Sequence, residues 1–573
     1  MTAERRRTQR RNSLTNIISA ASGRIRTSVS TGNRFIILAR NLSSRTKFDS
    51  DGTNSDGHTT NTDKSVTYSS TRGCSTQKSI SFRSAVMRGL AHDRGLFVPD
   101  SIPTVSPEEL ESWRSLNYAD LATEVIGKFV QEDEVPRDIL AGIVKKSCAA
   151  FRSEEVTPLV KVDGHYILEL FHGPTFAFKD VALQMLGNFF EYFLSTGSNG
   201  GRLAVLGATS GDTGSAAIYG LRGKKGVDCI ILFPTGRVSE IQERQMTTVP
   251  DDNIHCVSVD GTFDDCQDIV KASFADKEFR DHVKLGAVNS INWCRVLAQT
   301  TYYFWSYLRV TDLEKDVKKV NFSVPTGNFG DILAGYYSKR MGLPVGDLIV
   351  ATNENDILHR FFSNGEYHRE NIQKTISPSM DICVSSNFER YLFHLSGDDS
   401  STLASWMSAF ESTGKLLITG KKLNEARADF KSAKADTAKT LETIQKYHVN
   451  EDYMLCPHSA VGVSAVHQLN TANSATVCLA TAHFAKFGDA CSRAVNTLPE
   501  IPKELSQLWS LDTRSSNCPD DAKVVQKFME RKIEERIEKH EKQIEKKNFV
   551  KHLVLVSIAL GAVTVVVSAI RRR

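Results

Sequence analysis

Residues 202–219 read RLAVLGATSGDTGSAAIY, an apolar run that turns through glycines into a helix-compatible segment. Residues 321–337 repeat this pattern as NFSV, the loop PTGNFGD and then ILAGYY. A strand that leads through such a loop into a helix gathers free backbone N–H groups and the positive end of the helix dipole at one point, where anions bind. The two segments therefore predict an α/β fold with anion sites after two strands, although a strand–helix turn that binds nothing has the same local pattern.

Neither loop matches the common nucleotide-binding motifs. A Walker A motif would need Gly-Lys-Ser or Gly-Lys-Thr after the glycines, and neither loop contains G-x-G-x-x-G. A Rossmann dinucleotide site is therefore not predicted.

A third segment, LELFHGPTFAFKD at residues 168–180, places Lys179 among aromatic and apolar neighbours. Burial disfavours the charged form of a lysine and lowers its pKa. Such a lysine can form a Schiff base with an aldehyde. A lysine at the edge of an amphipathic helix has similar neighbours, so this residue alone leaves both interpretations open.

Together, these segments resemble the threonine synthase family, and they are similar to its longer, fungal-type branch. The matching strings span about residues 66–500 and are YSSTRG (68–73), RGLFVP (94–99), FHGPTFAFKD (171–180), GATSGDTGS (207–215), IQERQMTT (241–248), NSINWCR (289–295), PTGNFGD (325–331), ATNENDI (351–357) and TAHFAKF (481–487).

The resemblance implies a fold type II pyridoxal-phosphate enzyme, similar to the tryptophan synthase β chain, with two α/β domains and the cofactor in the cleft between them. Lys179 matches the Schiff-base lysine, and Thr481 matches the residue whose hydroxyl meets the pyridine nitrogen. No metal is expected. The loop that holds the cofactor phosphate is matched by Gly327, Asn328, Phe329, Gly330 and Asp331.

The substrate that the resemblance implies is O-phospho-L-homoserine. Ser210 and Thr213 match substrate contacts of the family, whereas Asn289, Ser290 and Arg295 match its phosphate contacts. The planar fork of an arginine suits this task because it can pair with two phosphate oxygens. The implied reaction eliminates phosphate from Cγ, adds water at Cβ and yields L-threonine, the last step of threonine biosynthesis.

Two segments depart from the family pattern. Phe484 stands where the family usually has proline, and residues 456–459 read CPHS where fungal-type members have Asp-Pro-His-Thr. Animal relatives with the CPHS variant resemble phospho-lyases that form an oxo acid and ammonia. A phospho-lyase that yields 2-oxobutyrate is therefore one alternative, and a membrane-tethered scaffold with weak catalysis is another. Asn328 and Phe329 keep the synthase form of the cofactor loop, which favours threonine synthesis.

The composition bounds the class of protein. With 573 residues, 40% hydrophobic and 24% charged, the chain is typical of globular proteins. Its net charge of +4 is concentrated in residues 1–48, which contain ten arginines and one lysine against one glutamate. The mildly acidic remainder gives no basic surface for a nucleic acid. Eleven cysteines without any C-x-x-C pair argue against a disulfide framework or zinc knuckle and indicate a reducing compartment.

Both ends differ from the catalytic region. The Arg-rich and Ser-rich start is typical of an organelle transit peptide or, equally, of a disordered basic arm. Residues 553–570 carry no charge and as a helix would reach about 27 Å, which nearly spans a hydrocarbon core of about 30 Å. They predict a transmembrane anchor, with a buried core helix as the alternative. The expected location is a mitochondrial or plastid membrane.

Between the catalytic region and the anchor, the chain is densely charged. An apolar stripe at helical spacing (Val525, Met529, Ile533, Ile537 and Ile544) predicts an exposed helix or a coiled-coil stalk for self-association. The expected organisation is a basic extension (1–65), an N-terminal threonine synthase region (66–165), a pyridoxal-phosphate-dependent region (166–510), a charged helical stalk (519–548) and the anchor (553–570).

Overall fold

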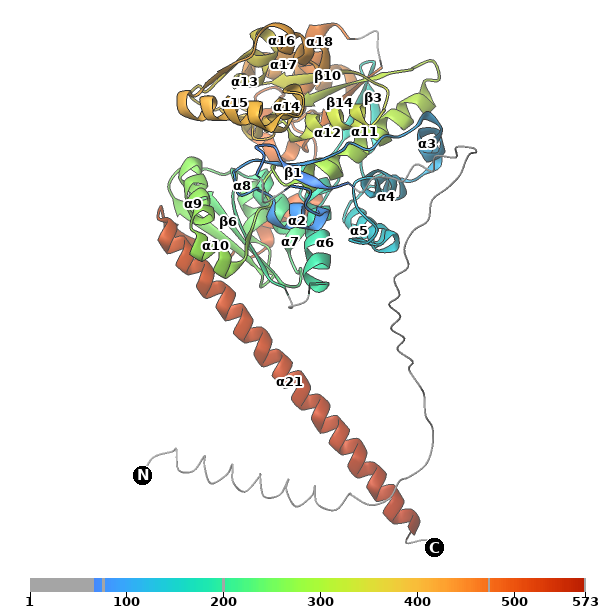
Figure 1. Ribbon diagram of the computed structural model, residues 1–573, viewed down its shortest axis with the longest axis vertical. Coiled ribbons are helices and arrows are strands. Elements are labelled where there is room, and N and C mark those ends of the chain that lie inside the picture. Colours follow the sequence, from blue (N-terminus) through green and yellow to red (C-terminus); the bar gives the residue numbers. More distant parts are fainter. Residues whose placement is uncertain (1–65, 75–77, 198–200, 472–474, 571–573) are drawn as a thin grey trace, which may run out of the picture. The chain divides into compact units, whose positions relative to one another are not determined.

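The computed structural model describes the backbone of residues 66–74, 78–197, 201–471 and 475–570, and side chains up to residue 552. The predicted N-terminal extension, residues 1–65, lies outside the described residues. Two mainly parallel sheets with flanking helices form the body of the chain (Figure 1), which confirms the predicted α/β class.

The first sheet has six strands in the order β13-β10-β9-β14-β4-β3, parallel except for β3, which is antiparallel to β4. Neighbouring residues of β10 face opposite sides of the sheet. Ile349 packs towards α18 (Pro457–Leu469), whereas Leu348 belongs to the main core that also contains α12 (Gly330–Arg340). A sheet covered on both faces needs strands that are apolar throughout. The strands are β3 (Leu159–Val162), β4 (His165–Glu169), β9 (Val320–Pro325), β10 (Val345–Thr352), β13 (Phe430–Lys434) and β14 (Thr476–Ala480).

The second sheet has five parallel strands in the order β15-β7-β6-β5-β8. The side chains of β5 also pack on both sides of the sheet. Val205 lies in the main core, and Leu206 lies in a separate cluster with α9 (Phe263–Ala275) and α21 (Ala522–Ile570). The strands are β5 (Leu203–Ala208), β6 (Val227–Pro234), β7 (Ile254–Asp260), β8 (Leu285–Gly286) and β15 (Ser516–Pro519). Two short antiparallel pairs complete the strands, β1 (Tyr68–Ser70) with β2 (Phe97–Pro99) and β11 (Glu366–His368) with β12 (Lys415–Leu417).

Both strand–loop–helix units predicted from the sequence are present, β5 leading into α7 and β9 leading into α12. The helices that build the layers are α2 (Phe82–Arg88), α3 (Pro107–Ser112), α4 (Tyr118–Gly127), α5 (Arg137–Cys148), α6 (Lys179–Ser195), α7 (Asp212–Leu221), α8 (Glu240–Thr247), α9 (Phe263–Ala275), α10 (Lys277–Val283), α11 (Trp293–Leu313) and α12 (Gly330–Arg340). Further along the chain are α13 (Ile357–Asn364), α14 (Phe388–Leu395), α15 (Ser400–Thr413), α16 (Gly420–Asp429), α17 (Thr437–Glu451), α18 (Pro457–Leu469), α19 (Gly488–Cys491), α20 (Lys503–Ser506) and α21 (Ala522–Ile570).

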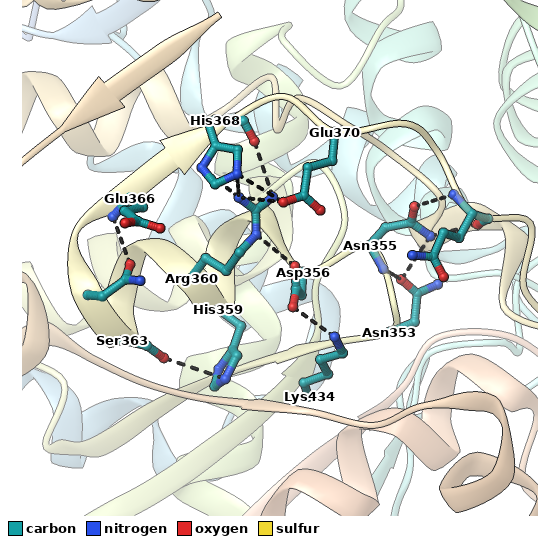
Figure 2. Close-up of polar contacts among 12 residues, drawn as sticks. Asn353, Asn355, Asp356, His359, Arg360, Ser363, Glu366, His368, Glu370 and Lys434 are labelled. Carbon is teal, nitrogen blue, oxygen red and sulfur yellow. Dashed lines mark hydrogen bonds and ion pairs between the residues drawn. The ribbon is translucent and has the colours of Figure 1, made fainter.

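Helix α13 is fastened to the edge of the six-stranded sheet by charged side chains (Figure 2). Arg360 pairs with Asp356 at 2.8 Å, and the same carboxylate accepts from Lys434 of β13 at 2.9 Å. Arg360 also contacts His368 of the β11–β12 pair. These contacts link α13 to β13 on one side and to the β11–β12 pair on the other.

Helix α21 is continuous from Ala522 to Ile570 (Figure 1). It includes most of the predicted stalk and the predicted anchor, residues 553–570, whose side chains lie outside the described residues. Across the part of the chain that the structure describes, no helix is both long and apolar enough to cross a bilayer. Val525 and Met529 of the apolar stripe are fully buried against the cluster around β6 and α9.

Candidate active site

Lys179 is the first residue of α6, and only 8% of it is exposed. Its burial follows the expectation from its apolar neighbours. Burial is also the main cause that lowers the pKa of Lys179; Asp212 opposes this shift, while Lys486 and Arg295 add to it. A lysine with a lowered pKa supplies more neutral amine, the form that attacks an aldehyde.

The loop before Lys179 is held by a buried carboxylate. The backbone N–H and hydroxyl of Thr175 each donate to Asp180 at 2.7 Å. Gly173 packs directly against Asp180, since a Cβ at this glycine would lie 2.4 Å from the Cβ of Asp180. Phe176 adopts the left-handed conformation at φ 59° and is nearly fully buried. Strained backbone of this kind persists only where its surroundings hold it in place, so the loop orients Lys179 firmly.

Asp212, the first residue of α7, faces two lysines. Its Oδ2 lies 3.5 Å from the Nζ of Lys179, and its Oδ1 lies 2.7 Å from the Nζ of Lys486. Gln242 donates to Oδ1 at 2.8 Å, and Ser379 donates to Oδ2 at 3.3 Å. Burial acts to raise the pKa of Asp212, but the two lysines outweigh it and hold this pKa well below the usual range. Asp212 therefore stays an anion.

Two further groups at this point come from distant segments. Lys486 is fully buried and donates to the carbonyl of Thr175 at 2.8 Å. The Nε2 of His458 accepts a hydrogen bond from the backbone N–H of Ser379 at 3.1 Å. Burial lowers the pKa of His458 to about 3, so its ring is neutral. Asp212, Lys486 and His458 lie within strings that resemble the family, but no role was predicted for any of them. Lys486 stands out in its string only as a charged residue between aromatic and apolar neighbours.

The loop from Gly327 to Asp331 enters α12 through a strained residue. Phe329 has φ 62° and packs among other aromatic rings in the core. A Cβ on Gly327 would lie 3.0 Å from the carbonyl of Ser379, so this position accepts little beyond glycine. The first N–H groups of a helix have no partner within it. The loop therefore presents backbone donors at the start of α12, suited to an anion.

The side chain of Asp331 braces this loop. Its Oδ1 accepts hydrogen bonds from the hydroxyls of Tyr302 at 2.5 Å and Tyr303 at 3.0 Å. Burial raises the pKa of Asp331 to about 6, and its Oδ2 has no hydrogen-bond partner. A carboxylate would repel a phosphate, so the backbone N–H of Asp331 is the group suited to bind one.

Arg295, in the first turn of α11, is a buried cation without a matching anion. Only 4% of it is exposed, and its Nη1 donates to the carbonyl of Val288 at 3.1 Å. Its Nε has no hydrogen-bond partner, and within the described part of the chain no carboxylate pairs with it. Burial lowers the pKa of Arg295 to about 10. Because a buried unpaired charge is costly, this arrangement favours binding of an anion.

The segment that contains Ser290 and the 327–331 loop are joined by hydrogen bonds to Ser386 and Asn387. Ser386 contacts the hydroxyl of Ser290 at 3.0 Å and donates to the Oδ1 of Asn328 at 3.1 Å. Asn387 donates from its side chain to the carbonyl of Ser290 and from its backbone to the carbonyl of Asn328, each at 3.0 Å. Ser386 and Asn387 were not expected from the sequence, and they link the segment that contains Arg295 to the loop before α12.

Thr481 follows β14 and lies beside the loop that bears Lys179. Its carbonyl accepts a hydrogen bond from the N–H of Phe178 at 2.8 Å, and its side chain is buried. The remaining predicted residues line the surroundings: Ser210 is exposed, whereas Thr213 and Asn289 are half-buried. Among the described residues, no hydrogen bond or ion pair joins Ser210, Thr213 or Asn289 to Lys179.

Cys456 and Phe484, which depart from the family pattern, lie close to the loop before Lys179. Cys456 caps the N-terminus of α18, where its Sγ accepts from the N–H of Ser459 at 3.4 Å. Phe484 is buried in the same cluster as Cys456 and Phe176. The two substitutions therefore occupy the apolar wall behind the loop rather than the polar groups around Lys179.

The arrangement suits a ligand that combines an aldehyde with a phosphate. Lys179 offers an amine, the 327–331 loop offers backbone donors, and Thr481 offers a hydroxyl. The guanidinium of Arg295 has no carboxylate partner among the described residues, so it suits a second anion, such as a phosphorylated substrate.

Family models match most of the chain. Residues 67–148 match the model described as threonine synthase N terminus, residues 150–420 the model of pyridoxal-phosphate dependent enzymes, and residues 459–529 the model described as threonine synthase, C-terminal.

Individual relatives agree. The chain is 50% identical over 484 residues to the threonine synthase of Saccharomyces cerevisiae, covering 78% of this chain and 94% of the relative. The crystal structure of threonine synthase from yeast matches with a TM-score of 0.78 at 46% identity, over 82% of this chain and 99% of the other. The pyridoxal-phosphate-bound threonine synthase of Brucella melitensis matches with the same TM-score at 41% identity, over the same shares.

Proposed function

This chain belongs to the threonine synthase family of pyridoxal-phosphate-dependent lyases and has threonine synthase activity, and on that premise we propose how its residues serve the reaction. The substrate is O-phospho-L-homoserine, which reacts with water to give L-threonine and phosphate. The observation that carries this proposal is the buried guanidinium of Arg295, which has an unpartnered Nε and no carboxylate within the described part of the chain.

Three groups would hold the cofactor. The Nζ of Lys179 would bond the aldehyde, the backbone N–H groups of residues 327–331 would bind the phosphate, and the hydroxyl of Thr481 would meet the pyridine nitrogen. Bound pyridoxal phosphate supplies an aldehyde for amines and a ring that withdraws electrons from the substrate Cα. A hydroxyl at the pyridine nitrogen, in place of a carboxylate, does not require this nitrogen to be protonated.

Lys179 also moves protons. With its amine free, Lys179 would take the Cα proton of the bound substrate as general base. The lowered pKa of Lys179 favours this role because it increases the share of the amine that is neutral. Asp212, 3.5 Å away, stabilises the ammonium that results.

The substrate is held at its two charged ends. Arg295, with Asn289 and Ser290, binds the phosphate and retains it as it leaves Cγ. Ser210 and Thr213 lie at the start of α7, where the positive end of the helix dipole favours the substrate carboxylate. Two anchored ends place Cα and Cβ at the amine of Lys179, which lowers the entropic part of the barrier.

The test is an assay of the full chain, loaded with pyridoxal phosphate and supplied with O-phospho-L-homoserine, in which phosphate and the organic product are quantified together. Equal amounts of phosphate and threonine support the proposal. They should be lost in Lys179→Ala and kept in Lys271→Ala, an exposed control lysine. Phosphate with 2-oxobutyrate and ammonia would replace the proposal with a phospho-lyase. Neither product, from protein that carries cofactor, would leave a catalytically weak scaffold.

We further propose that residues 553–570 attach the enzyme to a mitochondrial or plastid membrane and that residues 1–65 direct it there. The support is the sequence itself: eighteen uncharged residues followed by three arginines, and an Arg-rich start. Membrane fractions extracted with alkaline carbonate should retain the full chain and release a chain that ends at residue 548. Release of both chains would overturn the anchor, and loss of residues 1–65 without any change in location would overturn the targeting role.

A further inference from the structure

The site contains a second buried lysine for which the reaction provides no task. The Nζ of Lys486 lies 2.7 Å from Oδ1 of Asp212 and donates to the carbonyl of Thr175 at 2.8 Å, and its side chain is fully enclosed. Lys179 approaches the other oxygen of the same carboxylate at 3.5 Å. One buried carboxylate is thus shared by two lysine side chains, and the shorter contact belongs to Lys486.

The partner atoms of Lys486 are themselves held in place. Thr175 is fixed by its two hydrogen bonds to Asp180, and Asp212 is fixed by Gln242. Lys486 therefore bridges the loop before Lys179 and the start of α7, where the substrate carboxylate is proposed to bind.

The charges around Lys179 are unbalanced. Among the described residues, Asp212 is the one carboxylate in ion-pair contact with Lys179, at 3.5 Å. His458 is neutral because burial lowers its pKa, and the Oδ1 of Asp331, whose pKa burial raises to about 6, accepts from two tyrosine hydroxyls instead. If Asp212 paired with Lys179 alone, it would hold that side chain as an ammonium. The groups that face Lys179 are Asp212, Lys486, Arg295, His458 and Asp331.

Building on the proposed role of Lys179, we propose that Lys486 is a positioning residue: it occupies Asp212 and thereby leaves the Lys179 amine free to bond the cofactor aldehyde. Bond formation requires the neutral amine, whose lone pair adds to the aldehyde carbon. The C–N bond forms, and the aldehyde oxygen leaves as water with the two amine hydrogens. Any arrangement that keeps Lys179 protonated slows this step.

The experiment follows attachment of pyridoxal phosphate to the full chain after the cofactor has been stripped. The visible absorbance of lysine-bound cofactor is recorded against time between pH 6 and pH 10 for wild type, Lys486→Met, Lys486→Arg, Asp212→Asn and the double variant Lys486→Met with Asp212→Asn. In Lys486→Met the pH profile moves to higher pH, and below its midpoint attachment slows roughly tenfold for each unit of displacement. Lys486→Arg stays near wild type.

In Asp212→Asn the pH profile of cofactor attachment should shift in the opposite direction. Without Asp212, Lys179 loses its ion-pair partner while Lys486 and Arg295 remain, so its profile moves to lower pH. The double variant lies above Asp212→Asn because the remaining like charge has also been removed. This comparison isolates Lys486 even if Lys486→Met alone fails to fold, since the double variant buries no unpaired carboxylate. A purely structural role would move both single variants in the same direction.

The role of Lys486 and the role of Lys179 can fail separately in this experiment. Borohydride reduction followed by peptide mapping locates the cofactor. Wild type labelled elsewhere than Lys179 would overturn the assignment of Lys179 and this inference with it. Labelling at Lys179 together with an unchanged pH profile in Lys486→Met, or no difference between Asp212→Asn and the double variant, would overturn the role of Lys486 alone. Thermal melting of each variant checks that it is folded.

Discussion

Arg536, in the C-terminal helix α21, donates a 2.6 Å hydrogen bond to Asp228, whose side chain is buried in strand β6. The same guanidinium also donates to the carbonyl of Val227 at 2.7 Å. Together with the buried Val525 and Met529, this contact makes the first turns of α21 a structural part of the five-stranded sheet.

Replacement of Arg536 by methionine should loosen this end of the helix. It leaves the buried Asp228 with Arg202 alone, at 3.6 Å, and loss of one partner of a buried pair is strongly destabilising. We expect a loss of roughly 1–3 kcal/mol in the free energy of unfolding, with faster hydrogen exchange in residues 522–536. The control Arg531→Met breaks an exposed pair with Glu535 and should cost less than about 0.5 kcal/mol. Equal effects of the two variants would contradict a structural role for the Arg536 contact.

Acid should weaken the same interface through His255. This ring lies in β7, 6.4 Å from the ring of Phe528 in α21, and burial lowers its pKa to about 4. The unfolded chain, with a histidine pKa near 6.5, then binds more protons than the folded chain. Stability therefore falls as the pH decreases from about 6.5 towards 4, by on the order of 2 kcal/mol for this group.

Urea unfolding at pH 7 and pH 5 would measure that loss. His255→Gln should reduce the difference between the two pH values, because the group that takes up the proton is gone. An identical difference in wild type and variant would show that other groups cause the acid sensitivity.

Arg295→Gln should raise the KM for O-phospho-L-homoserine. The lost guanidinium is buried and charged, and truncation of such a partner costs about 2–5 kcal/mol of binding, which corresponds to at least roughly thirtyfold in KM. Cofactor absorbance should stay unchanged, since Lys179 and the 327–331 loop remain. Arg309→Gln, which alters a half-buried guanidinium near the far end of α11, is the control. An unaffected KM in Arg295→Gln would remove Arg295 from the phosphate site.

Gly211→Ala should disturb the site through Gln242. Gly211 has φ 144°, and a Cβ there would lie 2.4 Å from the Oε1 of Gln242, the residue that donates to Asp212. We expect a loss of about 1–3 kcal/mol in stability and slower cofactor attachment. Gly164→Ala is the matched control, because Gly164 has φ 75° with no atom within 4 Å of the added Cβ. It should cost about 1 kcal/mol and leave attachment unchanged.

Local patterns were enough for the elements that carry the two loops. The runs before Gly207 and before Pro325 form β5 and β9, and the segments after the glycines form α7 and α12. Apolar strands and glycine turns express preferences of a few neighbouring residues, so they can be predicted without the rest of the chain. The same is true of the burial of Lys179, which its aromatic neighbours indicate.

The meeting of Asp212, Lys486 and His458 could not be predicted in this way. They lie in α7, after β14 and in α18, up to 274 positions apart in the chain, and nothing near Lys486 in the sequence names its partner. The link from Ser290 to Asn328 through Ser386 is equally non-local. An apolar stripe predicted a helix at Val525 and Met529, but a stripe does not specify the surface it will cover.

The α/β class, the two glycine loops, the family and the burial of Lys179 could be predicted from the sequence alone, because each depends on short-range chemistry or on strings of residues in order. Three relationships required the tertiary structure: which charged groups lie around Lys179, that the buried Arg295 has no anionic partner among the described residues, and that the first turns of α21 pack on the catalytic body. Those relationships depend on distances between segments far apart in the chain, and packing alone sets such distances.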